Sequence, residues 1–315
     1  MDQERKHEKY DRLIARCLGL SPTPTAVAHP CDESSLAGAL DAAKLGLIAP
    51  TLVGPQARIR TVAQKLGLDL AGIETVDAEH SEESAAKAVA LVRQGRAEAL
   101  MKGSLHTDEL MGAVVRRETG LRTARRISHC FVMDVPGHDD ALIITDAAVN
   151  IAPDFVSKVD IVQNAIDLAR ALGMDTPRVA ILSAMETVNP AVPSTLEAAA
   201  LCKMADRGQI TGGILDGPLA LDNAIDLQAA RIKKIDSPVA GRASILVVPD
   251  LEAGNMLAKS LTFLAGADAA GIVLGARVPI ILTSRADSMT TRLASCAVAV
   301  LVAKARRESA PKSVG

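Results

Sequence analysis

The sequence predicts an α/β fold with mostly parallel sheets covered by helices on both faces. Short apolar runs rich in β-branched residues alternate with longer segments in which apolar residues recur every three or four positions. This alternation is typical of strands joined by helices, and such connections place neighbouring strands parallel. The chain of 315 residues is also long enough for two domains of ordinary size.

The individual elements follow from the same pattern. The strand candidates are Thr25–His29, Leu47–Val53, Ala99–Met101, Ile127–Val135, Leu142–Thr145, Val179–Leu182, Gly213–Leu215, Ser244–Val248, Gly271–Leu274 and Ile280–Leu282. The helix candidates are Ser81–Gln94, Asp108–Thr119, Lys158–Leu172, Thr195–Arg207, Asn223–Lys234 and Glu252–Ala265. Ser81 and Thr107 suit N-caps, and glycines such as Gly120 and Gly208 suit left-handed C-caps.

The composition is that of a globular protein and argues against nucleic-acid binding. Apolar residues make up 49% of the chain and charged residues 23%, which excludes a disordered protein. The net charge of -2 and the pI near 6.3 provide no basic surface for a nucleic acid. Because Trp is absent and Phe and Tyr are rare, the core must be built from Ala, Leu, Ile and Val.

Cysteine usage and apolar runs predict a cytoplasmic protein. The five cysteines are scattered and lack the CxxC or His/Cys spacing of a zinc site, so we expect reduced thiols. The start of the chain is charged and lacks the apolar region of a signal peptide. The longest apolar run, Ala294–Ala303, is about half the roughly 20 residues that a membrane helix needs. We therefore expect no membrane span.

Several well-known catalytic motifs are absent. The sequence has no GxGxxG dinucleotide motif, no GxxxxGK[ST] phosphate loop and no GxSxG nucleophile elbow. Its six histidines form no HExxH motif and no cluster, which weighs against a metal enzyme. We therefore expect chemistry on a substrate that arrives already activated.

Polar residues at strand ends are the main candidates for a site, because parallel sheets bind ligands beyond the carboxyl ends of their strands. The segment Ser284–Ser288, SRADS, follows an apolar strand and precedes an apolar helix. A guanidinium and hydroxyls at a helix N-terminus form a natural anion site. The alternative is an ordinary helix start, with Ser284 or Asp287 as its cap and Arg285 solvated.

The segment Lys102–Thr107, KGSLHT, lies at another strand-to-helix junction. Gly103 would let backbone N–H groups approach a phosphate, while Lys102 and Ser104 would supply a charge and a hydroxyl. The alternative is a tight turn in which Thr107 is a plain N-cap.

Other strand ends carry carboxylates and amides, which could hold a ligand or equally serve turns and helix caps. These weaker candidates are Asp146 with Asn150, Glu186 with Asn189, Asp216, Asp222, and Asn255 in the Gly254-Asn255 pair that opens a helix.

Taken together and in this order, the segments resemble the phosphate acetyl/butyryltransferase family, and its butyryl-type branch most closely. The resemblance runs from about Met101 to Ser288. The stretches that carry it include MKGSLHTDELM, RISHCFVMDV, LIITDAAVNIAPD, ILDGPLALDNAI, SPVAGRASILVVPDLEAGNMLAKSL and VPIILTSRADS.

The resemblance implies a fold similar to that of the isocitrate and isopropylmalate dehydrogenases. Such proteins have two α/β/α domains with an interdomain cleft and are usually homodimers. We expect the first domain to comprise residues 1–120 and 271–315, and the second to comprise residues 121–270.

The resemblance also implies an acyltransferase that moves a short acyl group, acetyl to butyryl, reversibly between coenzyme A and inorganic phosphate. Neither a cofactor nor a metal nor a covalent enzyme intermediate is expected, and the partners are acyl-CoA and phosphate or acyl phosphate. Two alternatives stay open: a non-catalytic acyl-CoA or acyl phosphate-binding protein, and a dehydrogenase of the same cleft fold. The second would need a nucleotide site and metal-binding acids, and the sequence shows neither.

Site residues follow from the resemblance position by position. A functional Ser-Arg pair of the acetyl branch corresponds to Ser284 and Arg285. That branch places its presumed catalytic base at the position of Thr291, so the nearest acid, Asp287, is the third catalytic candidate. The substrate-binding candidates are Lys102, Gly103, Ser104, Thr107, Asp146, Glu186, Asp216, Asp222 and Asn255.

Overall fold

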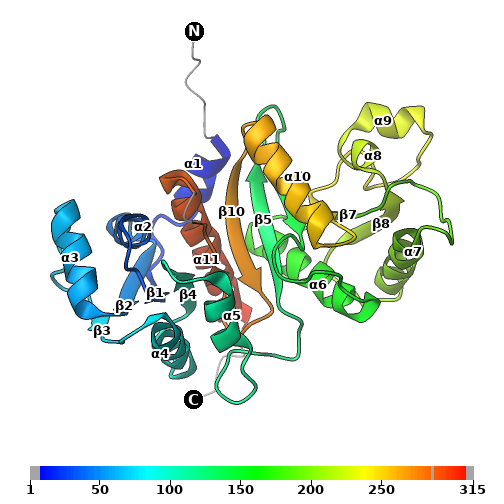
Figure 1. Cartoon of the computed structure of the whole chain (residues 1–315). Coiled ribbons are helices and arrows are strands. Elements are labelled where there is room, and N and C mark those ends of the chain that lie inside the picture. The colour runs from blue at the N-terminus through cyan, green and yellow to red at the C-terminus, as the bar shows by residue number, and fades with distance from the viewer. Residues whose placement is uncertain (1–7, 285–286, 310–315) are drawn as a thin grey trace, which may run out of the picture. The chain divides into compact units, whose positions relative to one another are not determined.

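The chain folds into two α/β units (Figure 1). The computed structural model describes residues 8–284 and 287–309. The first unit contains the chain up to Arg125 and again from Ala270 onward, and the second contains Arg126–Ala269. The first unit is therefore discontinuous in sequence, with the second inserted into it.

The strands of the first unit lie in the order β3-β2-β1-β4-β11-β10. Their pairings are parallel except for the antiparallel pair of β10 and β11. Their bounds are β1 Thr23–Ala28, β2 Ile48–Val53, β3 Thr75–Val76, β4 Ala99–Lys102, β10 Asp268–Leu274 and β11 Ile280–Ile281. Because β1 lies between β2 and β4, the chain reverses direction across the sheet at β1, and ligands favour such switch points.

Helices cover both faces of these strands. Their bounds are α1 Glu8–Ala15, α2 Glu33–Lys44, α3 Gln56–Leu66, α4 Ser81–Arg93, α5 Thr107–Val115 and α11 Met289–Ser309. Right-handed crossovers place α2 and α3 on one face and α4 on the other, and Figure 1 shows α2 and α4 on opposite sides of β1 and β2. Helix α11 packs beside α2, and α5 packs beside α4.

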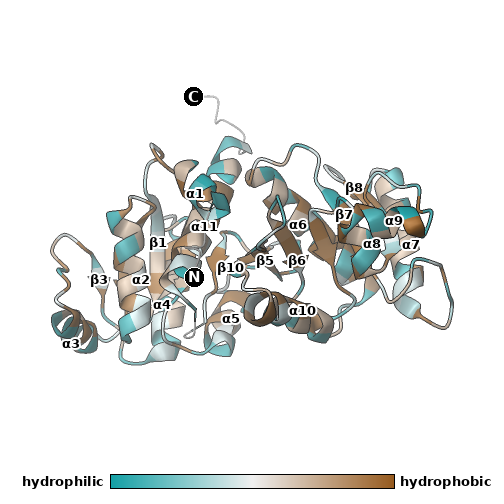
Figure 2. Ribbon diagram, turned by 90° about the horizontal axis from the view of Figure 1, so that it is seen from above, coloured by the Kyte–Doolittle hydropathy of each residue, from teal (hydrophilic) through white to brown (hydrophobic). Residues whose placement is uncertain are grey.

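The second unit has the strand order β5-β6-β9-β7-β8, with one antiparallel pair, β5 and β6, and parallel pairs beyond it. The bounds are β5 Ser128–Asp134, β6 Leu142–Thr145, α6 Phe155–Ala171, β7 Arg178–Leu182, α7 Pro193–Asp206, β8 Ile214–Leu219, α8 Leu221–Ile225, α9 Leu227–Ile232, β9 Ile245–Val247 and α10 Leu251–Leu264. Its core is built from aliphatic side chains with Met133, as the composition predicts, and Figure 2 shows the apolar residues along these strands.

The predicted α/β fold with mostly parallel strands is confirmed, although several boundaries differ. The N-caps of α4 and α5 are His80 and His106, one residue before the predicted Ser81 and Thr107. Helix α5 ends at Val115 because Arg116 leaves the helical backbone, so Gly120 is not its C-cap. None of the described helices has the length and apolar character that crossing a membrane requires.

Candidate active site

In the first unit, Lys102 connects the carboxyl ends of two neighbouring strands. Its side chain is buried although it carries a charge. The ammonium group donates to the backbone oxygen of Gly103 at 3.4 Å and to that of Thr283, just after β11, at 3.3 Å. The KGSLHT segment is therefore joined by a buried cation to Thr283, the residue directly before the SRADS segment, at one edge of the sheet.

Gly103 is required by the close approach of β4 to the end of β1. Its N–H donates to the Ala28 oxygen at 2.8 Å, and a Cβ atom at this position would lie only 2.3 Å from that oxygen. Ser104 continues the contact, because its N–H and its hydroxyl both donate to the His29 oxygen. The Ser104 hydroxyl also accepts from the Cys31 N–H. Both residues thus fasten the loop to β1.

Thr107 is exposed at the start of α5. The N-terminus of this helix is held by Glu109, whose carboxylate accepts from the His106 N–H at 2.7 Å and from the Ser81 hydroxyl. These two hydrogen bonds, that from Ser81 being the larger influence, lower the pKa of Glu109. The cap role that the sequence gave to Thr107 as an alternative is filled by His106 and Glu109.

Ser284 lies exposed at the turn between β11 and α11. Its N–H donates to Oδ2 of Asp287 at 2.6 Å. In the described part of this turn, Asp287 is the acidic residue, as the sequence indicates, but one of its oxygens is used to close the turn. Arg285, the other predicted member of the pair, lies outside the described residues.

Position 291, where the acetyl branch places a carboxylate, belongs to the cap of α11. The Thr291 N–H donates to the Ser288 hydroxyl at 3.1 Å, and that hydroxyl lies 3.2 Å from the Thr291 hydroxyl. Ser288 is therefore the residue that caps the helix, and neither Ser284 nor Asp287 is needed for that role.

A buried arginine that sequence reasoning missed lies directly behind the Ser284 turn. The Arg292 side chain is only 3% exposed. Its guanidinium donates to the Ser284 oxygen at 2.6 Å, to the Thr283 hydroxyl at 3.2 Å and to the Ser34 hydroxyl at 3.3 Å. The only signal in the sequence was a cation directly before the apolar run Leu293–Ala303.

A cavity of about 300 Å³ opens beside the same sheet edge, where β1 and β4 end. The residues that line it include His29, Arg58, His106 and Glu109. Burial, and then Arg58, lower the pKa of His29, so its ring is neutral near pH 7. Its Nδ1 bonds to the Ser84 hydroxyl at 2.9 Å. Sequence reasoning passed over His29 because it counted this residue as the last of the predicted strand Thr25–His29, whereas β1 ends at Ala28.

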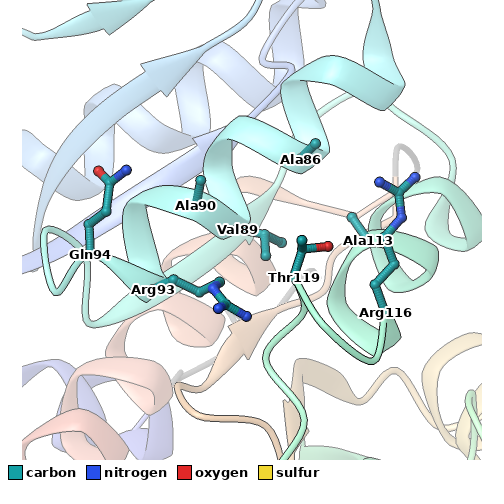
Figure 3. Close-up of a pocket in the computed structure, with 8 residues that line it drawn as sticks. All are labelled: Ala86, Val89, Ala90, Arg93, Gln94, Ala113, Arg116 and Thr119. Carbon is teal, nitrogen blue, oxygen red and sulfur yellow. The ribbon is translucent and has the colours of Figure 1, made fainter.

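A second hollow, of about 450 Å³, lies between α4 and α5 (Figure 3). Ala86, Val89 and Ala113 form its apolar wall, and Arg93 and Arg116 stand at its edge. Arg93 donates to the Glu118 and Gly120 oxygens and so fastens the loop that follows α5. None of the predicted site residues that the structure describes lines this hollow.

In the second unit, Asp146 organises the turn after β6. The carboxylate is buried and accepts from the N–H groups of Ala148, Val149 and Asn150 and from the Asn150 amide at 2.6 Å. Asn255 donates to the Ala147 oxygen in the same turn. The structure therefore brings Asp146 and Asn255 together, with the oxygens of Asp146 engaged by its own loop.

Glu186 and Asp222 meet around a lysine that the sequence did not single out. Lys233 lies 3.1 Å from a Glu186 oxygen and 3.5 Å from an Asp222 oxygen. The hydrogen bond from Lys233 is the main reason that the pKa of Glu186 is lowered.

Asp216 lies apart from both groups, inside β8 rather than after it. The predicted strand stopped at Leu215, but β8 continues to Leu219 through Pro218. A proline is tolerated there because β8 ends the strand order of its unit. Asp216 is therefore not a strand-end residue, and its carboxylate accepts from the N–H of Gly217.

Solved structures share the fold of this chain. The structure is similar to a phosphotransacetylase from Streptococcus pyogenes, with a TM-score of 0.81, 22% identity and coverage of 96% of this chain and 100% of that one. It is also similar to 4-hydroxythreonine-4-phosphate dehydrogenase from Klebsiella pneumoniae, with a TM-score of 0.53, 13% identity and coverage of 90% and 100%. Both likenesses concern the fold alone, and the second agrees with the predicted dehydrogenase-like architecture.

The sequence comparisons identify the family. Residues 81–300 match the phosphate acetyl/butaryl transferase family, and the chain belongs to it. It is 71% identical to a phosphate acetyltransferase from Rhizobium meliloti over 95% of both chains. It is 42% identical to a phosphate butyryltransferase from Clostridium beijerinckii over 94% of this chain and 98% of that one. The family predicted from the sequence is confirmed, and the chain is an acyltransferase.

Proposed function

We propose that this protein transfers a short acyl group reversibly between coenzyme A and inorganic phosphate, with acetyl as the first group to test. The observation that carries the proposal is the 71% identity to a protein named phosphate acetyltransferase across nearly the whole of both chains. The lower identity to the butyryltransferase, 42%, favours an acetyl over a butyryl group.

The reaction asks the protein for positioning and charge. A phosphate oxygen attacks the thioester carbonyl, the carbon–sulfur bond breaks, and the CoA thiolate leaves and takes up a proton. The tetrahedral oxyanion between these steps needs preorganised donors. The exposed Ser284 hydroxyl is our candidate donor, and Arg285 is the candidate clamp for the phosphoryl oxygens.

Asp287 is our candidate for proton exchange with the CoA thiol. One of its oxygens is held by the Ser284 N–H, which fixes the carboxylate next to the proposed oxyanion donor. Since a CoA thiol should titrate near the cysteine value of about 8.5, a nearby carboxylate can assist formation of the thiolate in the reverse reaction. The buried charges of Lys102 and Arg292 lie behind this turn and favour an anionic substrate in front of it.

We further propose that the reaction needs neither a metal nor a cofactor, because a thioester is already activated. We also propose that the protein acts in the cytoplasm as a homodimer, without nucleic-acid or membrane partners. Size-exclusion chromatography with light scattering tests the dimer, and activity after dialysis against a chelator tests the metal.

The decisive experiment is thiol release from acetyl-, propionyl- and butyryl-CoA with and without phosphate. We expect release that depends on phosphate and is fastest with acetyl-CoA, with acetyl phosphate as the product. Release that is equally fast without phosphate would mean hydrolysis and refute the proposal. Tight CoA binding by calorimetry with no turnover would indicate a binding protein instead.

A further inference from the structure

Ser284 is held at both of its backbone polar groups. Its backbone N–H is bound by Asp287 at 2.6 Å, and its backbone oxygen is bound by Arg292 at 2.6 Å. Both backbone polar groups of one exposed residue are therefore fixed by charged side chains. The Cα–Cβ bond of Ser284 therefore points in a fixed direction. Rotation of either adjoining peptide would break a charge-assisted hydrogen bond.

Arg292 donates mainly to the turn before α11. Two of its three hydrogen bonds go to consecutive residues, to the Thr283 hydroxyl and to the Ser284 oxygen. The start of α11 does not need them, because Ser288 already caps that helix through the Thr291 N–H. The guanidinium therefore serves the turn before the helix rather than the helix itself.

The buried charge of Arg292 lowers the stability of the fold. Among the residues that the structure describes, no carboxylate contacts the Arg292 guanidinium; Asp32 is reached only through the Ser34 hydroxyl, which joins the two groups. Burying a charge without a carboxylate in direct contact is expensive, and Asp32 interacts with Arg292 only electrostatically and through Ser34. The glycine at position 38 leaves room for the Arg292 side chain, since a Cβ atom there would lie 3.0 Å from Cδ of Arg292. The fold thus accommodates a buried arginine whose presence is not explained by a contribution to stability.

We propose that Arg292 is a positioning residue for acyl transfer, which holds the Ser284 turn so that the Ser284 side chain faces the reacting carbonyl. This inference rests on the proposed function. Arg292 acts through the Thr283 hydroxyl and the Ser284 backbone oxygen, so its loss should lower kcat by about 100-fold, the cost of a misplacement near 1 Å. The KM for acetyl-CoA should change little, since Arg292 contacts the turn and not the substrate.

The test compares Arg292→Ala with Arg306→Ala, which removes a guanidinium from the other end of the same helix. Arg306 also donates to a backbone oxygen, that of Ala276, and so controls for the loss of such a bond. We expect kcat to fall about 100-fold for Arg292→Ala and to stay within about twofold for Arg306→Ala. Millimolar guanidinium should restore at least about a tenth of the lost rate in Arg292→Ala, because it can refill the vacated site. Equal ionic strength from sodium chloride should not.

The outcomes separate the two proposals. If the unsubstituted protein shows no phosphate-dependent thiol release, the proposed function fails. If it is active and Arg292→Ala keeps its kcat, or loses it without guanidinium rescue, the positioning role fails. Should Arg292→Ala not fold, Thr283→Val removes one acceptor of Arg292 with a near-isosteric side chain. That variant should lower kcat by about threefold to tenfold, and an unchanged kcat would overturn the inference.

Discussion

The contact between Gly103 and β1 gives the sharpest prediction about stability. In Gly103→Ala, the new Cβ atom would lie 2.3 Å from the Ala28 oxygen and 2.5 Å from the His29 oxygen. Both are backbone atoms in a buried strand end, so no flexible side chain can move aside. Relief requires β4 to move away from β1, which breaks the bonds from Gly103 N–H to Ala28 and from Ser104 N–H to His29.

The loss of stability in Gly103→Ala follows from the lost backbone hydrogen bonds and from overpacking. A buried backbone donor without its partner costs about 1–3 kcal/mol, and overpacking adds about 1–3 kcal/mol. Allowing for partial relaxation of the loop, we expect Gly103→Ala to lower the free energy of unfolding by about 3–5 kcal/mol. That is a large share of the roughly 5–15 kcal/mol that stabilises a typical protein.

Gly112→Ala is the matched control, because it makes the same chemical change in the helix that follows the loop. Gly112 lies in α5, and a Cβ atom there would meet nothing within 4 Å. An alanine in a helix interior is favoured over glycine by about 1 kcal/mol, so this variant should be more stable than the unsubstituted protein. Urea unfolding followed by circular dichroism measures both. A Gly103→Ala protein within about 1 kcal/mol of the unsubstituted one would refute the steric reasoning.

Three further predictions concern the site and its surroundings. The pKa of Glu109 is lowered from its ordinary value of 4.5, so the carboxylate stabilises the protein above that pH and this stabilisation is lost as the pH falls through the folded-state pKa. The difference in unfolding free energy between the unsubstituted protein and Glu109→Gln should therefore shrink from pH 7 to pH 3 in urea titrations. A constant difference would contradict this. Ser284→Ala should lower kcat about 100-fold without changing the unfolding midpoint, because the side chain is exposed; an intact kcat would remove Ser284 as oxyanion donor. Asp287→Asn keeps an oxygen for the Ser284 N–H but loses the base, so pH–rate profiles of the reverse reaction should lose one ionisation, and an unchanged profile would point to another base.

The sequence was a good guide to the elements that carry strong apolar periodicity. The strands that the structure contains near Thr25, Leu142, Val179 and Ile280 were predicted within a few residues. Helix α3 was not predicted, because only Ile59 and Ala63 are buried in it and the periodic signal is weak. The Asn223–Lys234 helix is two helices, since Asp226 ends α8 and its side chain caps α9 through the Ala229 N–H.

Strand ends could be predicted as the place for a site, but the partners of each residue could not. Lys102 and Ser104 were chosen for their place at a strand end, and the structure places Lys102 beside the turn that contains Ser284, whereas Ser104 bonds to His29 and Cys31 at the end of β1. Lys233 and Arg292 were missed because each lies on or after a helix, where its role depends on the direction of a long side chain. No local pattern contains that information.

The charges around the Ser284 turn come from segments that only the fold brings together. Lys102 and Thr283 are 181 positions apart in the chain, and they meet only because β4 and β11 are parallel neighbours. Arg292 approaches the same turn from a helix that packs beside α2. Two buried cations thus lie behind residues 283 and 284, while the nearby carboxylate of Asp287 is turned to a backbone N–H. A doubly charged phosphate in front of the turn would gain from both cations at once, which neither segment could offer alone.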